Sequence, residues 1–197
     1  MRRLCSRVAL ALLLVCTLTL AFRIQPGRSS PATITVPDDY PTIQAAIDAA
    51  SPGDTVFVRA GTYNGSIHID KPLTLEGESS QNTILRIQRP TQYYLIGFHV
   101  NASNVTVSGF HMISPVAASK GDDVMLIVVD GRGGVTSDNC AIKDNVLEEY
   151  GTDALTLMGS RGDEVVGNVI SSQHGSCTLL MSSSNCLIRN NSLSGSE

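Results

Sequence analysis

Tryptophan is absent from the sequence, and aromatic residues make up only 5% of its 197 residues. Flat aromatic rings are the side chains on which sugar rings stack, so few stacking platforms are available. Tyr40 and Tyr63 lie near the hydrophobic strands of the N-terminal part, where we expect them to pack. The remaining tyrosines are therefore the candidate platforms: Tyr93, Tyr94 and Tyr150.

Long apolar runs are also scarce. The one long run, from Val8 to Phe22, follows three arginines and is too short for the roughly 20 residues that cross a bilayer. Small residues at its end complete the pattern of a signal peptide over residues 1–21, with an uncleaved anchor as the alternative. Because no second such run follows, we expect a mature chain without a membrane span that is secreted, periplasmic or at the cell surface.

Basic residues are outnumbered, with 14 lysines and arginines against 18 aspartates and glutamates. Cleavage after Ala21 removes Arg2, Arg3 and Arg7, which leaves 11 basic residues against 18 acidic ones and a net charge of −7. A field of this sign repels phosphate-rich partners. We therefore expect no nucleic-acid partner and no attraction to anionic membranes.

The last third of the chain contains a repeat with a period of 23 residues. Its phrases are NCAIKDNVL at 139–147, GDEVVGNVI at 162–170 and NCLIRNNSL at 185–193. A unit of this length is too short to bury its own apolar face, so it must stack on its neighbours as a solenoid. No helix of crossover length follows Ala50, so the strands must pair in parallel as the chain winds, which makes a parallel β-helix.

The repeat also assigns positions within each coil. It predicts an asparagine ladder at one turn, where side-chain amides bond up and down the stack. It predicts a ladder of inward apolar residues in the neighbouring strand. The two ladders are Asn145, Asn168 and Asn191, and Val107, Ile142, Val165 and Ile188. Phe110 occupies the first equivalent turn position, so we expect the asparagine ladder to end there.

The period also constrains the cysteines. Cys5 and Cys16 lie in the leader, which leaves Cys140, Cys177 and Cys186. Cys140 and Cys186 are two repeats apart, a separation of about 10 Å at about 4.8 Å per coil. Because a disulfide needs Cα atoms within roughly 7 Å, we expect these two cysteines not to pair.

The N-terminal part differs from the repeats. Residues 22–33 are rich in Pro, Gly and Ser and predict a flexible lead-in, while residues 34–58 form a compact head. Apolar residues spaced at i, i+3, i+4 and i+7 predict a helix over residues 41–50 of the head. We expect this helix to cover the exposed end of the first coil, with coils extending over residues 55–197.

One coil departs from the period. The coil that begins at Asn104 is 12 residues longer than the others, and aligning Leu126 with Leu155 places the excess in two loops, near residues 115–121 and 130–135. Insertions in solenoids lie on the outside and often form the binding face. This coil is therefore the candidate site.

Charged and aromatic residues around these loops supply the candidate ligand contacts. The candidate substrate-binding residues are Asp122, Asp123, Asp130, Arg132 and Tyr150. The three aspartates are also candidate Ca²⁺ ligands, with Arg132, Lys120 or Lys143 as the base of a lyase. The alternative is that the aspartates are solvated turn formers.

A copper site is a second possibility. Met158 and Met181 are one repeat apart, and His174 precedes Met181 in the same coil. Copper binds sulfur and imidazole ligands, and stacked apolar methionines are the alternative. No cofactor motif is evident, so Ca²⁺ stands as the first candidate ion and copper as the second.

The segment TIQAAIDAASPGDTVFVRAGTYNGSIHIDKPLTLEGE, Thr42 to Glu78, and the N-x-x-I-x-x-N repeats after it resemble the right-handed parallel β-helix, or pectin-lyase-like, superfamily. The chain is most similar to its carbohydrate-binding and sugar-hydrolysing repeat proteins and to the periplasmic NosD proteins, which help supply copper to nitrous oxide reductase. Over residues 34–197 the resemblance implies an all-β, right-handed parallel β-helix solenoid of about six coils with a short N-terminal capping helix.

The sequence contains no complete catalytic motif of the enzymes in this superfamily. Pectin methylesterases share the head, but the downstream phrases that hold their catalytic residues have no match here. Phrases similar to those of polygalacturonases occur in a different order, and two of them, at Gly151 and His174, are one repeat apart, as turn sequence would be. Because this fold hosts many activities, whether the protein is an enzyme stays open.

We therefore expect a secreted β-helix protein that binds or acts on polysaccharide at the cell surface. One alternative is a polysaccharide lyase or glycosidase fragment whose active site is incomplete. Another is a NosD-like periplasmic copper-delivery protein. The sequence stops one strand into a coil, which predicts an end that is open, truncated or covered by end-to-end association.

Overall fold

The computed structural model describes residues 30–87, 94–114, 123–173 and 175–195. The predicted signal peptide over residues 1–21 and most of the predicted lead-in lie outside these residues. The helix and all strands of the described residues belong to the unit that begins at Pro31. Within the described residues, no helix has the length and apolar character that a membrane span needs.

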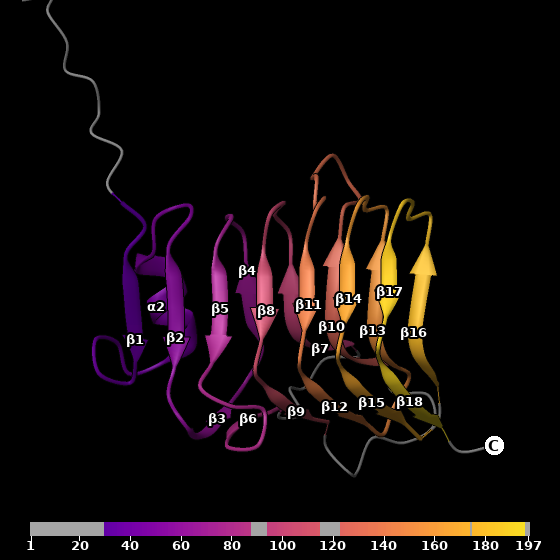
Figure 1. Cartoon of the computed structure of the whole chain (residues 1–197), viewed down its shortest axis with the longest axis horizontal. Coiled ribbons are helices and arrows are strands. Elements are labelled where there is room, and N and C mark those ends of the chain that lie inside the picture. The colour runs from indigo at the N-terminus through magenta and orange to yellow at the C-terminus, as the bar shows by residue number, and fades with distance from the viewer. Residues whose placement is uncertain (1–29, 88–93, 115–122, 174, 196–197) are drawn as a thin grey trace, which may run out of the picture. The chain divides into compact units, whose positions relative to one another are not determined.

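The unit consists of three parallel sheets that wind around one core (Figure 1). Sheet A contains β1 (Thr33–Val36), β2 (Thr55–Val58), β5 (Thr74–Gly77), β8 (Thr106–Ser108), β11 (Ala141–Lys143), β14 (Glu164–Val166) and β17 (Leu187–Arg189). Sheet B contains β3 (Gly61–Asn64), β6 (Thr83–Arg86), β9 (His111–Ile113), β12 (Val146–Glu149), β15 (Val169–Ser172) and β18 (Ser192–Gly195). Sheet C contains β4 (Ile67–Ile69), β7 (Tyr94–Val100), β10 (Asp123–Asp130), β13 (Asp153–Met158) and β16 (Ser176–Met181).

Each of the five coils from β2 to β16 contributes one strand to sheet A, then one to sheet B and one to sheet C, while β1 precedes them and β17 and β18 follow. Every strand pairs in parallel with the strand one coil away, as in β8 with β11 and β11 with β14. Without crossover helices, such pairing requires the chain itself to wind around the core. The predicted all-β parallel solenoid is therefore confirmed.

Several boundaries differ from the sequence-based expectation. Strands β1 and β3 were not predicted, because TITV lies in the head and GTYN contains no aliphatic residue. The predicted alignment of Leu126 with Leu155 is wrong by one residue, since Ile127 is the partner of Leu155. The predicted helix over 41–50 is shorter in the structure and spans Ile43–Ala49.

The helix α2 spans Ile43–Ala49 and packs on β1, β2 and β4. Thr42 is its N-cap, and the Thr42 hydroxyl accepts a hydrogen bond from the Ala45 N–H, so the helix begins after Thr42 and not at Pro41. At the other end Lys71 Nζ donates to the carbonyls of Ile47, Asp48 and Ala50. These contacts attach the predicted capping helix to the next coil.

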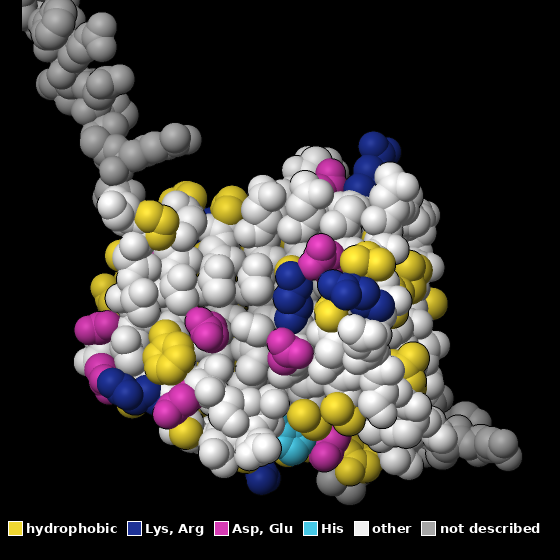
Figure 2. Space-filling model, in the orientation of Figure 1, with side chains coloured by type: hydrophobic (Ala, Val, Ile, Leu, Met, Phe, Trp, Pro, Cys, Tyr) yellow, Lys and Arg dark blue, Asp and Glu magenta, His cyan; other side chains and the backbone are white. Residues whose placement is uncertain are grey.

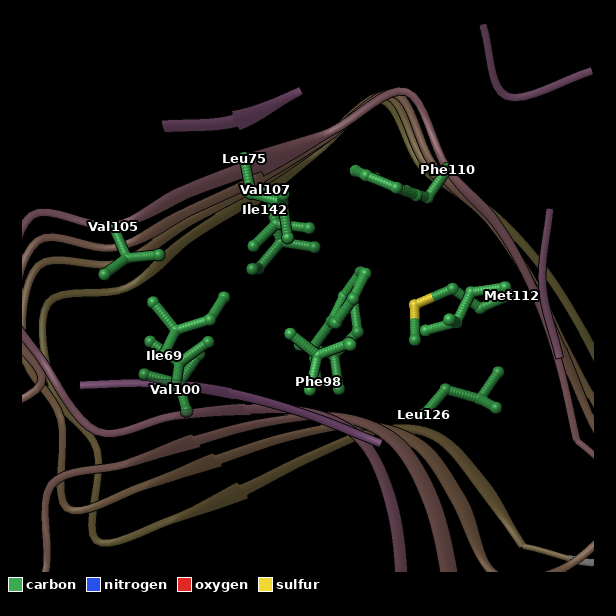
Figure 3. Close-up of a cluster of buried hydrophobic side chains, with 14 of the residues drawn as sticks. Ile69, Leu75, Phe98, Val100, Val105, Val107, Phe110, Met112, Leu126 and Ile142 are labelled. Carbon is green, nitrogen blue, oxygen red and sulfur yellow. The ribbon is translucent and has the colours of Figure 1, made fainter. Parts of the chain in front are cut away.

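The core is a stack of apolar side chains enclosed by the three sheets (Figure 3). The inward ladder of sheet A brings the predicted residues into register: Val107 with Ile142, Ile142 with Val165, and Val165 with Ile188. Phe98 from sheet C and Phe110 from the turn after β8 meet edge to face, with ring centroids 5.2 Å apart and planes at 81°. Both phenylalanines are fully buried.

The asparagine column lies at the turn from sheet A to sheet B. Asn145 Nδ2 donates to Asn168 Oδ1 over 3.1 Å, and Asn168 Nδ2 donates to Asn191 Oδ1 over 3.0 Å. The same oxygens accept backbone N–H groups of the coil before, at 3.0 and 2.9 Å. At the start of the column, the Phe110 N–H donates to Asn145 Oδ1, so Phe110 ends the side-chain series but stays bonded to it.

The residue before each column position adopts a left-handed backbone. The four residues are Gly109 (φ 75°), Asp144 (φ 54°), Gly167 (φ 72°) and Asn190 (φ 56°). Gly, Asn and Asp are the residue types that tolerate this conformation. In each repeat, the left-handed residue forms the turn and the asparagine that follows it joins the column.

Sheet A presents a face of mixed charge. Figure 2 shows basic and acidic side chains next to one another over this sheet. Across β11 and β14, Lys143 Nζ lies 2.7 Å from Glu164 Oε2. Lys143, a predicted candidate for the base of a lyase, is thus held by a carboxylate on the outside of sheet A.

Candidate functional site

Two histidines lie side by side on the outer face of sheet C. His68 on β4 is directly across from His99 on β7, and their ring centroids are 5.4 Å apart with planes tilted by 59°. Both sit in a hydrophobic–His–hydrophobic triplet whose flanking residues point into the core. Since successive side chains in a strand point to opposite faces, both imidazoles are directed outward.

The backbone of His68 is fixed by the capping helix. β4 is the last strand of sheet C, so its outer edge has no neighbouring strand. Gln44 of α2 replaces that strand: its Oε1 accepts the His68 N–H at 2.8 Å, and its Nε2 donates to the His68 carbonyl at 3.1 Å. The first histidine is therefore held by the cap as well as by the sheet.

An ion pair borders the second histidine. Arg132 donates from Nε and Nη2 to the two carboxylate oxygens of Asp130, at 2.9 and 3.0 Å. Asp130 Oδ2 lies 3.7 Å from His99 Nε2, which is too long for a hydrogen bond. The carboxylate therefore influences His99 through its charge, while its hydrogen bonds go to Arg132.

These neighbours determine the protonation states of the site. The Arg132 side chain lowers the pKa of Asp130 to about 2. The pKa of His99 is lowered, first by burial of the ring and then by the nearby His68, while Asp130 opposes the shift. At neutral pH the His99 imidazole is therefore uncharged, which is the form that binds metals.

We predict that Asp130→Asn lowers the pKa of His99 further. The substitution removes the carboxylate that favours the charged imidazole and keeps the size of the side chain. The pKa is read from the pH titration of the His99 Cε1–H resonance. Glu164→Gln, which changes a carboxylate on sheet A, serves as the control and leaves the His99 titration unchanged. A rise in the pKa of His99 in Asp130→Asn would contradict the assigned electrostatics.

The histidine pair is a site with few ligands. Among the described residues, no three His, Cys, Asp or Glu side chains gather where they could hold one metal ion. Imidazole nitrogens suit Cu, Zn, Ni and Fe ions. The two rings therefore offer two donors, and any further donor must come from solvent or from a partner.

The predicted calcium site does not form around one ion. Asp123 and Asp130 are the first and last residues of β10, so about 23 Å of extended strand separates them. Calcium ligands must all lie about 2.3–2.6 Å from the ion. Asp122 lies outside the described residues, as does the side chain of Asp123. Asp130 therefore lies too far along the strand to share one ion with Asp123, while a calcium site that involves Asp122 stays a prediction.

The other predicted substrate contacts are also separated. Arg132 follows the end of β10, whereas Tyr150 precedes the start of β13. Because β10 and β13 are parallel neighbours, the two residues lie at opposite ends of these strands. Tyr150 is half-buried, and its backbone N–H donates to Ser114 Oγ at 2.7 Å. Of the five predicted residues, the structure brings together Asp130 and Arg132.

The predicted copper ligands are placed only in part. Met158 and Met181 are neighbours in the register of β13 and β16, and His174 lies outside the described residues. Met158 is almost completely buried, whereas Met181 is 45% exposed. The described part of this set therefore supplies two thioethers.

The three cysteines among the described residues, Cys140, Cys177 and Cys186, form no disulfide. Asp163 lies between Cys140 and Cys186: it accepts the Cys140 N–H at 2.9 Å and lies 3.9 Å from Cys186 Sγ. Burial raises the pKa of Cys140 to about 12, so its thiol stays protonated at neutral pH.

Sequence analysis missed the histidine pair because the two residues are 31 positions apart, eight more than the period. The signal that identifies them is the shared pattern of IHI at 67–69 and FHV at 98–100, which the sheet aligns residue by residue. The extra residues lie partly between β5 and β6 and partly between β6 and β7, so the period fails in this coil as well.

Comparison with solved structures shows the fold. One crystallised pectin methylesterase variant, bound to a hexasaccharide, has a TM-score of 0.57 and 13% identity, covering 85% of this chain and 66% of that one. Pectin methylesterase PemA from Erwinia chrysanthemi has a TM-score of 0.48 and 11% identity, covering 77% and 67%. The chain thus spans 66% of the length of the first structure. At this identity the similarity shows the right-handed parallel β-helix fold alone.

Sequence comparison gives the family. A comparison with curated proteins finds no match. The family model described as "Periplasmic copper-binding protein (NosD)" matches residues 47–197, from the capping helix through every coil. The chain therefore belongs to the NosD family of right-handed parallel β-helix proteins.

Proposed function

We propose that this protein is an exported copper-binding protein that holds Cu(I) between His68 and His99. The observation that carries the proposal is the alignment of two imidazoles on adjacent strands, with ring centroids 5.4 Å apart. Metal–imidazole bonds are about 2 Å long, so rotation of the two side chains lets both rings contact one ion.

The chemistry of the pair favours Cu(I) over other ions. Cu(I) is a closed-shell ion that is stable with two nitrogen donors, whereas Zn²⁺ takes four ligands in protein sites. Ca²⁺ takes six to eight oxygen ligands. A pair of imidazoles without further converging donors among the described residues therefore suits Cu(I) best.

The surroundings keep the pair ready to bind. The lowered pKa of His99 leaves its nitrogen free of a competing proton at neutral pH. Gln44 holds the backbone of His68, and Arg132 pairs with Asp130 beside His99. Neither of these contacts has to change when an ion binds. His99 remains 32% exposed and His68 is exposed, so an ion can enter and leave from solvent. Such access suits transient binding and delivery better than a closed structural site.

Two sequence features support an exported location. Residues 1–21 have the pattern of a signal peptide. The family is described as periplasmic. We therefore propose that copper binding takes place in the periplasm or at the cell surface.

The test is an anaerobic competition titration with a chromophoric Cu(I) chelator. We expect one Cu(I) per protein, and we expect His68→Gln and His99→Gln each to weaken binding at least about 100-fold, since even substitutions around a metal's ligands cost about 10–100-fold. His111→Gln, on β9 of sheet B, is the matched control and keeps the parent affinity.

Two outcomes would contradict the proposal. One is Cu(I) binding that survives in the His68→Gln, His99→Gln double variant. The other is loss of binding in Met181→Leu with full binding in both histidine variants, which would transfer the site to the methionines on β13 and β16. Circular dichroism of each variant checks that the fold is retained.

A further inference from the structure

A pocket lies at the N-terminal end of the solenoid, and its lining includes Ile67 and Gln44, the residue that holds the His68 backbone. It has a volume of about 410 Å³ and is formed by the start of α2, strands β3 and β4, and one residue of β6. This volume is within the range of about 300–1,000 Å³ that small-molecule sites have. Of the residues that line this pocket, the copper proposal uses Gln44 alone, through its contact with the His68 backbone.

The pocket has an apolar floor and a polar rim. Ile43, Ile67 and Leu85 form the floor, and all three are buried. Thr62, Asn64 and Ser66 line the rim, and all three residues are exposed. None of these three makes a side-chain hydrogen bond to another described residue, so their hydroxyl and amide groups are available to a ligand.

Tyr63 forms an aromatic wall between floor and rim. It stands directly across from Leu85 in sheet B, and its hydroxyl donates to the Arg59 carbonyl at 3.0 Å. This bond and the packing against the core fix the orientation of the ring. A fixed aromatic face beside hydroxyl and amide groups matches a sugar ring, which has an apolar C–H face and a polar circumference.

Charge restricts the class of ligand. No charged side chain is among the described residues that line the pocket. An anionic sugar such as a uronate would have to lose hydration here without gaining a cationic partner. We propose that this pocket binds a neutral saccharide, with Tyr63 stacked on one sugar ring and Thr62, Asn64 and Ser66 bonding its hydroxyl groups.

The test is a titration of the protein with maltose, cellobiose and lactose, followed by methyl NMR. We expect at least one of the three sugars to produce saturable shifts of the Ile43, Ile67 and Leu85 methyl resonances, with a Kd on the order of 1 mM. We expect trigalacturonate, the anionic control, to leave the same resonances unchanged.

Three variants locate the binding. Tyr63→Ala and Asn64→Ala are each expected to weaken the affinity about tenfold; Asn64 is exposed, so its removal leaves the core intact. Tyr150→Ala is the control, because Tyr150 is a half-buried tyrosine outside the pocket, and it keeps the parent affinity. The proposal is overturned if no neutral sugar shifts the floor methyls, if trigalacturonate binds equally well, or if Tyr150→Ala abolishes binding while Asn64→Ala does not.

Discussion

Asn168→Ala is expected to lower the free energy of unfolding by about 3–5 kcal/mol, because it leaves several buried polar groups without partners. Asn168 is fully buried. Its Oδ1 accepts two N–H groups of Asn145, at 3.0 and 3.1 Å, and its Nδ2 donates to the Ile142 carbonyl at 2.9 Å. An unpaired buried donor or acceptor costs about 1–3 kcal/mol. Urea denaturation followed by circular dichroism measures the change.

Two further variants separate hydrogen bonding from packing. Asn168→Asp keeps the shape of the side chain but removes the Nδ2 donor, so we expect a loss comparable with that of Asn168→Ala. Asn82→Ala removes an exposed asparagine whose side chain has no hydrogen-bond partner among the described residues, and its effect should stay within about 0.5 kcal/mol. A small effect of both Asn168 substitutions would show that the column is not what stabilises the turn.

Gly109→Ala is the second substitution with a large expected effect. Gly109 has φ +75°, and a Cβ there would overlap the carbonyl oxygen of Gly77 in the coil before it. The left-handed backbone alone costs a non-glycine residue about 1–2 kcal/mol. The added Cβ would be fixed to the Gly109 backbone, and the oxygen it overlaps belongs to the Gly77 backbone. The overlap can therefore be relieved only by moving the two coils apart. We expect a total loss of about 3 kcal/mol or more in thermal or urea unfolding.

Gly133→Ala is the matched control for Gly109→Ala. Gly133 has a similar φ of +69°, but a Cβ there would meet nothing within 4 Å. It should therefore lose only the backbone contribution of about 1–2 kcal/mol. Equal losses in the two variants would contradict the close approach of the coils at Gly77 and Gly109.

The repeat accounts for how well the fold could be predicted. Asn145, Asn168 and Asn191 recur at one turn because that turn combines a left-handed residue with an amide that bonds along the stack. Such a requirement restricts the residue types and therefore leaves a visible period in the sequence. The helix boundary at Thr42 was less visible, because it depends on a single capping hydrogen bond.

The candidate site was less predictable than the fold. Pairing of His68 with His99 depends on the register of β4 and β7, and the extra residues on either side of β6 conceal that register in the sequence. Asp123 and Asp130 were assigned to the two inserted loops of one coil, but they are the first and last residues of an extended strand, which keeps them apart. Side chains on an outer sheet face are free to vary, so they leave no period that would reveal them.

X-ray absorption at the copper edge of the Cu(I)-loaded protein identifies the atoms that coordinate the ion. We expect imidazole nitrogens at about 2 Å from the copper and no sulfur near about 2.3 Å. We also expect this imidazole signature to disappear in the His68→Gln, His99→Gln double variant. A sulfur shell in the parent protein, or an unchanged spectrum in the double variant, would contradict copper binding between His68 and His99.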